Sequence, residues 1–92
     1  MMKREKLMKQ LETKWKIDFV STTEDFSGSP GGIWLSGEDS VEMKDGSNMF
    51  DYYCERHNTY TFGVHKTMHK WLQDRGWYAE WNDAGTIMLH EI

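Results

Sequence analysis

The segment 62–92 constrains the fold more than any other stretch, because it combines a helical repeat, a glycine stop and a hairpin pattern. Four apolar residues follow the i, i+4, i+7, i+8 spacing of one helix face, namely Val64, Met68, Trp71 and Leu72. Gly76 can then adopt the left-handed conformation that ends a helix without a Cβ clash. The spacing therefore predicts one main helix over residues 62–75.

A β-hairpin is expected directly after this helix. Trp77, Ala79 and Trp81 recur with the period of two that is typical of a half-buried strand. Residues 82–85 carry turn-forming side chains, and residues 86–89 are β-prone. The helix is the nearest cover for one face of the hairpin, so residues 62–92 predict a helix–hairpin core. Its expected buried members are Trp71, Leu72, Trp77 or Trp81, and Ile87 or Leu89.

The remaining segments predict shorter elements around that core. A surface helix is expected over residues 2–14 and a loop over 21–32. Three short strands are expected at residues 15–20, 33–35 and 41–43, the last two as a hairpin. Residues 47–57 fit a short helix or an aromatic-rich strand, and we favour the helix. This order of elements predicts a single α+β domain over residues 1–92, with an antiparallel sheet of hairpins.

Charge divides the chain into three parts. Residues 1–16 hold six basic and two acidic side chains, a basic N-terminal helix. Residues 18–55 hold nine carboxylates and one lysine, an acidic middle. Residues 56–92 are balanced, with four charges of each sign. Segregation of this kind indicates the type of partner more than the type of fold.

The cellular compartment is constrained by three absences from the sequence. A single cysteine, Cys54, excludes an internal disulfide and suits a reducing compartment. No apolar run approaches the ~20 residues of a membrane span. The first ten residues lack the apolar region of a secretory signal. We therefore expect a cytoplasmic protein that does not bind membranes.

One constellation has metal-binding residue types, namely Cys54, His57, His65 and His69. Its C-x2-H and H-x3-H halves could in principle supply four ligands to zinc. The usual zinc module has two cysteines in its first half, however, and this chain has one. Lys66 also stands where a metalloprotease helix has its glutamate. The sequence predicts no metal.

Other catalytic arrangements are equally poorly supported. A lone cysteine such as Cys54 is more often a small buried hydrophobe than a nucleophile. The carboxylate pairs Glu24–Asp25 and Glu38–Asp39 lie in turn-like sequence, where general-acid work is not expected. The glycines of residues 28–32 lack the Lys-Ser/Thr ending of a phosphate loop. We expect no enzyme activity and no cofactor.

The acidic middle is the strongest candidate for a functional surface. Carboxylates interleaved with aromatic residues suit binding to a basic protein surface, because carboxylates steer the encounter and aromatic rings anchor it. The candidate partner-binding residues are Glu24, Asp25, Trp34, Glu38, Asp39, Glu42, Asp45 and Tyr52. Two alternatives stay open: an ordinary solvated surface, and a small nucleic-acid-binding protein that uses the basic helix 2–14. The acidic middle makes direct nucleic-acid binding the weaker alternative. The sequence leaves the oligomeric state open, and a homodimer is compatible with it.

The C-terminal third, with FGVHK followed by RGWYAEWNDAGTIML, resembles small phage-encoded proteins of the early-gene, host-takeover type. The resemblance implies a non-enzymatic inhibitor or modulator that binds a host protein in the bacterial cytoplasm, such as a nuclease or another nucleic-acid-binding defence factor. It transfers no functional residue, because this grouping shares no catalytic motif.

Overall fold

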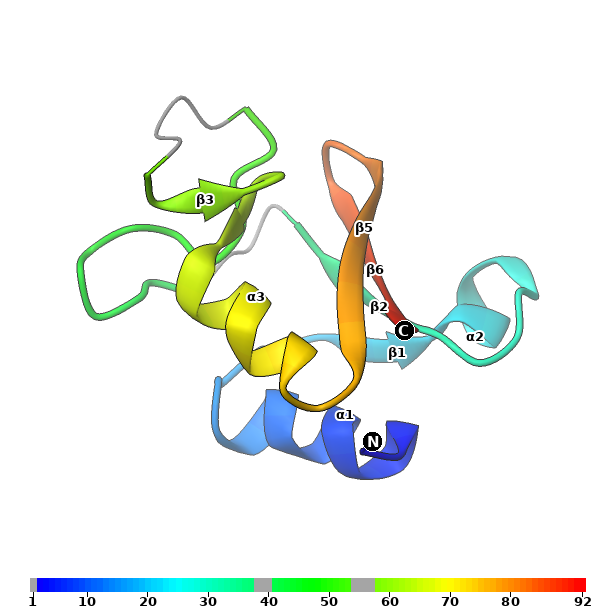
Figure 1. The fold of residues 1–92 in the computed structure, drawn as a ribbon. Helices are drawn as coiled ribbons and strands as arrows, with labels where there is room; N and C mark the ends of the chain where they lie inside the picture. Colours follow the sequence, from blue (N-terminus) through cyan, green and yellow to red (C-terminus); the bar gives the residue numbers. More distant parts are fainter. Residues whose placement is uncertain (1, 38–40, 54–57) are drawn as a thin grey trace.

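The computed structural model describes residues 2–37, 41–53 and 58–92. Its elements follow the order α1 (Arg4–Thr13), β1 (Val20–Thr22), α2 (Thr23–Ser27), β2 (Ile33–Ser36), β3 (Tyr60–Thr61), β4 (Val64–His65), α3 (Lys66–Gln73), β5 (Trp77–Asp83) and β6 (Thr86–Glu91). The expected α+β class with an antiparallel sheet is confirmed (Figure 1).

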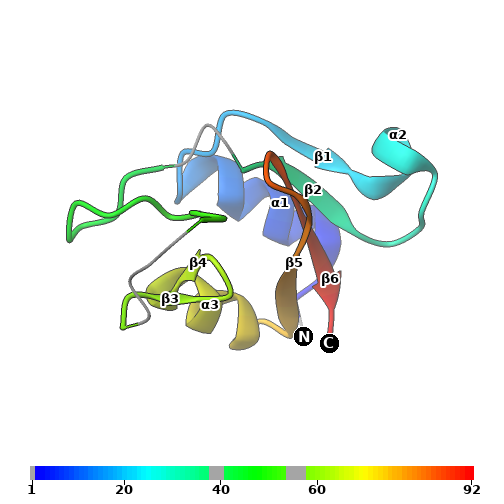
Figure 2. The ribbon, with the colours of Figure 1, turned by 90° about the horizontal axis from the view of Figure 1, so that it is seen from above.

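The main sheet has the strand order β1-β2-β6-β5, and every neighbouring pair is antiparallel. Strand β6 is therefore internal, and it joins the predicted C-terminal hairpin to β2 through pairs such as Ile33–Leu89. In Figure 2, α3 lies to one side of the sheet strands and α2 to the other. A separate two-stranded sheet, β3 and β4, precedes α3.

One face of the sheet forms the core with α1 and α3. Leu7 and Leu11, four residues apart on α1, are fully buried. They share one cluster with residues of α3 and of the sheet, namely Met68, Trp71, Leu72, Ile33, Leu35, Trp77, Ile87 and Leu89. The predicted helix–hairpin core is confirmed: Trp71, Leu72, Trp77, Ile87 and Leu89 are all buried.

The prediction that the main helix begins at residue 62 is wrong. Residues 60–65 form the β3–β4 hairpin, with Thr61 opposite Val64 and the loop residues Phe62 and Gly63 at positive φ. Helix α3 begins at Lys66, capped by the His65 side chain, whose Nδ1 accepts a hydrogen bond from the Thr67 N–H at 3.2 Å. Val64 matches the apolar spacing of the helix because it is buried, but it is buried as a residue of strand β4.

Four shorter predictions also need correction. Residues 15–20 are not a strand, since Lys16 has a φ of 58° and β1 begins at Val20. The expected loop 21–32 contains α2, which Thr22 caps through the Asp25 N–H. Residues 41–43 do not pair with β2, whose neighbours are β1 and β6. Residues 47–53 are not helical, and the rest of that prediction, 54–57, lies outside the described residues.

Trp81 of β5 connects the main sheet to a second lobe, residues 41–53 and 58–65. Its Nε1–H donates to the Phe62 carbonyl at 2.7 Å, and its ring makes edge contacts with Phe50 and Tyr52. Two glycines make room for the indole. A Cβ on Gly37 would lie 2.5 Å from the Trp81 ring, and one on Gly63 would lie 2.9 Å from its Nε1.

We predict that Gly37→Ala lowers the free energy of unfolding by about 1–3 kcal/mol, because the added methyl group overlaps the Trp81 ring. The measurement is urea unfolding of four proteins: wild type, Gly37→Ala, Trp81→Phe and the double variant. The cost of Gly37→Ala should shrink in the Trp81→Phe background, since the overlapped ring atoms are absent there. An equal cost in both backgrounds would mean that the indole does not fill this space.

Candidate partner-binding surfaces

The structure separates the predicted acidic surface into two distant groups. Glu24, Asp25 and Trp34 lie on α2 and β2. Glu42, Asp45 and Tyr52 lie in the segment 41–53 of the second lobe, on the opposite side of the molecule from α2 (Figure 1). Glu38 and Asp39 lie outside the described residues. The carboxylates that the structure describes in the acidic middle therefore do not form one continuous surface.

Three aromatic residues gather on the sheet face that points away from the core; we call Phe19, Phe26 and Trp34 the sheet-face patch. Ile33 and Leu35 point into the core, so Trp34 between them faces the other way. The rings of Phe19 and Phe26 each lie 4.8 Å from the Trp34 ring, centroid to centroid. Phe19 and Phe26 are 49% and 40% exposed. An exposed aromatic group of this kind is typical of a binding surface.

Charge is sorted between the two layers of the fold. The elements β1, α2, β2, β5 and β6 contain no lysine or arginine. Their acidic residues are Glu24, Asp25, Glu80, Asp83 and Glu91. Glu80 lies opposite Met88, which lies opposite Trp34, so one carboxylate shares a cross-strand row with the patch. Helices α1 and α3 carry five cations, Arg4, Lys6, Lys9, Lys66 and Lys70, against the two carboxylates Glu5 and Glu12. By cross-strand register Glu80 and Asp83 lie on the open face with Trp34, whereas Glu91 lies opposite the buried Trp77. The open sheet face is therefore acidic through Glu80 and Asp83, and the helical layer has a net positive charge.

Glu24 forms an ion pair within the chain. The Arg4 guanidinium donates through Nη1 to both of its carboxylate oxygens, at 2.6 and 2.9 Å. These hydrogen bonds from Arg4, with a smaller contribution from backbone N–H groups, lower the pKa of Glu24 to about 2. The pair ties the start of α1 to α2. Glu24 and Asp25 are both exposed, but Glu24 is paired with Arg4, which leaves Asp25 as the carboxylate of α2 with no ion pair to the described residues.

Asp45 also forms hydrogen bonds within the chain. It accepts hydrogen bonds from the Ser47 N–H at 2.9 Å and from His65 Nε2 at 3.0 Å. Because His65 Nδ1 accepts from Thr67, the ring proton lies on Nε2, facing Asp45. The bond from His65 is the largest cause of a pKa of about 2 for Asp45. Both ring nitrogens of His65 are therefore engaged in hydrogen bonds within the chain.

A second exposed aromatic group, which the sequence reasoning largely missed, lies at the end of the second lobe. We call Tyr52, Tyr53 and Phe62 the tip cluster; they are 47%, 76% and 90% exposed. The Tyr52 ring lies 5.0 Å from Tyr53 and 5.2 Å from Trp81. Tyr52 was predicted as a binding residue, whereas Phe62 was assigned to the main helix. Gly63 between two β-prone dipeptides was the part of the sequence that is compatible with this hairpin tip, whereas Phe62 is not a usual turn residue.

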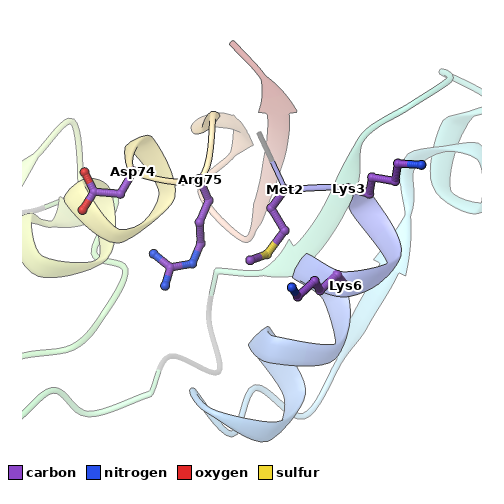
Figure 3. A pocket seen from close by; sticks show the side chains of 5 residues that line it. All are labelled: Met2, Lys3, Lys6, Asp74 and Arg75. Carbon is purple, nitrogen blue, oxygen red and sulfur yellow. The ribbon is translucent and has the colours of Figure 1, made fainter.

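A hollow between α1 and the end of α3 is lined by Met2, Lys3, Lys6, Asp74 and Arg75 (Figure 3). Figure 3 shows the Lys3 ammonium and the Asp74 carboxylate directed away from it. The Arg75 guanidinium lies 4.0 Å from the Trp71 ring centroid and donates to the Trp71 carbonyl at 2.9 Å. Arg75 thus has a structural role, and the hollow gives little support to phosphate binding.

Within the described ranges, no group of three or more His, Cys, Asp or Glu side chains is placed to hold a metal ion. Cys54 and His57 lie outside those ranges. None of the helices that the structure describes has the length and apolar character needed to cross a membrane. Comparisons of the chain with protein-family models, curated proteins and solved structures gave no match.

We predict that acid destabilises the fold in part through Glu24 and Asp45. Both pKa values are about 2 in the folded chain, below the ordinary carboxyl values of about 4. Their contribution to stability is therefore present above pH ~5 and is lost as the pH falls toward 2. Glu24→Gln and Asp45→Asn should each reduce the fall of the thermal midpoint between pH 5 and pH 2. Glu12→Gln, on an exposed position of α1, is the control, and a pH profile like its own would refute the assignment.

The absence of a metal remains a prediction for Cys54, His57, His65 and His69. Untagged protein should contain no stoichiometric zinc, and a chelator should leave its thermal midpoint unchanged, because His65 already donates to Asp45 and caps α3. Elemental analysis of the purified protein checks this. Bound zinc whose removal also unfolds the chain would show the prediction to be wrong.

Proposed function

We propose that the protein is a non-enzymatic binding protein that docks onto a basic surface of a partner protein through its open sheet face. The observation that carries the proposal is the sheet-face patch on a layer without lysine or arginine. Aromatic side chains are the commonest anchors of protein interfaces, and surrounding carboxylates accelerate the encounter with a basic partner.

The partner class follows from charge complementarity. Nucleic-acid-binding proteins present basic grooves, and an acidic surface can occupy such a groove in place of the phosphate backbone. We therefore propose a phage-type inhibitor or modulator of a host protein, such as a nuclease or another defence factor, acting in the bacterial cytoplasm. The resemblance of the C-terminal third to phage early-gene proteins motivates this part of the proposal.

The alternative, nucleic-acid binding through the basic helix, has weaker support. Arg4 is paired with Glu24, and Arg75 lies against Trp71. Lys6 and Lys9 remain as the basic residues of α1 that can reach a phosphate backbone. We keep this alternative as an outcome of the test.

The test is binding kinetics against the protein that the wild-type chain captures from a bacterial lysate. Trp34→Ala should speed dissociation by ~30-fold, as expected for loss of an aromatic hot spot of about 2 kcal/mol. The pair Asp25→Lys and Glu80→Lys should slow association and flatten its dependence on salt.

The matched control is Lys6→Glu with Lys9→Glu, which reverses the same number of charges on the opposite layer and should leave both rates unchanged. If this control abolishes binding while Trp34→Ala does not, the open sheet face is not the docking surface. A gel shift with plain DNA that only the Lys6 and Lys9 variants lose would favour the nucleic-acid alternative.

A further inference from the structure

Phe62 occupies a backbone conformation that bulky residues rarely adopt. It has a φ of 50°, and Gly63 after it has a φ of 77°. The two residues form the loop between Thr61 and Val64, which are paired across the β3–β4 hairpin. Two-residue loops with positive φ at both positions favour Asn-Gly and Asp-Gly, because a large side chain is strained there. Asparagine at position 62 would suit this turn better than phenylalanine.

Burial does not offset that strain. The Phe62 side chain is 90% exposed, the largest exposed fraction among the exposed large hydrophobic residues of the described chain. A strained and solvent-exposed aromatic residue contributes little to folding. Strain of this kind tends to persist where the side chain has a function outside the fold.

The backbone around Phe62 is held firmly. Its carbonyl accepts from Trp81 Nε1 at 2.7 Å, and the Gly63 carbonyl accepts from the Asp51 N–H at 2.8 Å. A Cβ on Gly63 would lie 2.8 Å from the Asp51 carbonyl oxygen, so the turn packs closely against the rest of the lobe. The turn therefore presents the Phe62 ring from a fixed base, which lowers the entropy cost of binding through it.

The charge near the tip cluster points to a basic partner. Residues 47–53, 58–65 and 77–92 contain no lysine or arginine. The carboxylates closest in sequence to the tip are Asp51, next to Tyr52, and Asp83, two residues after Trp81; Glu80 faces the open sheet face and Glu91 pairs with Trp77 at the other end of β5. A second copy of this chain would present the same acidic tip, and like charges oppose that pairing. The hollow in Figure 3 is lined mainly by charged residues and is a poor receptor for a phenyl ring.

We propose that Phe62 is an anchor that inserts into an apolar pocket, rimmed by basic side chains, on the partner protein. Tyr52, whose ring contacts Trp81 beside the turn, is a second exposed aromatic side chain that the same partner can contact. This inference rests on the proposed function only in requiring a partner protein. It adds a second contact region, formed by the second lobe rather than by the sheet-face patch.

Phe62→Asn gives opposite changes in stability and binding. Relief of the turn strain should raise the thermal midpoint by a few degrees, ~4 °C or more for a domain of this size. Loss of the anchor should weaken binding to the captured partner by ~30-fold, measured by titration calorimetry. Phe62→Tyr keeps the ring and should keep most of the affinity. Ile92→Asn, at an apolar residue that is also exposed, is the control and should leave binding unchanged.

Each contrary result has a defined meaning. A lower midpoint for Phe62→Asn would remove the strain argument and overturn the proposal. Unchanged binding of Phe62→Asn, with binding lost in Trp34→Ala, would leave the proposed function standing and reject this anchor. Unchanged binding in both variants would reject both proposals. If the wild type self-associates and Phe62→Asn abolishes this, the receptor is a second copy of the chain. If the wild type binds labelled oligothymidine and Phe62→Asn does not, the receptor is a nucleobase. Either result overturns the proposal.

Discussion

The packing of Trp81 ties the tip of the second lobe to the main sheet. The second lobe has only two strands of two residues each, too short to hold a position by backbone pairing alone. The Trp81 indole fills the space beside Gly37 and Gly63. It donates a hydrogen bond to the Phe62 carbonyl and makes edge contacts with the rings of Phe50 and Tyr52. A register shift in β5 lies between Trp81 and Asp83, where the strand leaves its regular pairing with β6. Trp81 thus holds the Phe62 turn and Tyr52 against the sheet, while Met49, Phe50 and Val64 join the second lobe to the common core.

Charge gives the molecule two different faces. The α1–α3 layer is basic and the open sheet face is acidic. The sequence alone shows only a basic N-terminal segment, residues 1–16, followed by an acidic segment, residues 18–55. The Arg4–Glu24 pair joins the layers at one edge and uses one charge of each sign. In the second lobe, Asp45 is likewise used to orient His65, which in turn caps α3. The carboxylates left for a partner are therefore fewer than the composition implies.

The sequence predicted the parts of the fold whose periodicity is continuous. The helix face with Met68, Trp71 and Leu72, the hairpin after Gly76 and the strand at residue 33 were all predicted correctly. It could not predict that β6 pairs with β2, because nothing local in Ile33 or Leu89 specifies a partner that far along the chain. The helix was predicted to begin too early because Val64, a buried strand residue, lies at the spacing expected for the apolar face of the helix. Trp34 was recognised as a candidate binding residue, but its neighbours Phe19 and Phe26 come together with it only through folding.

The internal position of β6 also bears on how the chain reaches this structure. Strand β2 lies between β1 and β6, so it cannot complete its pairing until β6 has been synthesised, after more than half of the chain has followed it. Contacts of such long sequence separation close late and slow the folding reaction. During that interval Ile33 and Leu35 have no partner strand on one side, and nascent chains in this condition are the ones that chaperones engage. The same topology that secures the finished sheet therefore leaves the newly made chain dependent on its last strand.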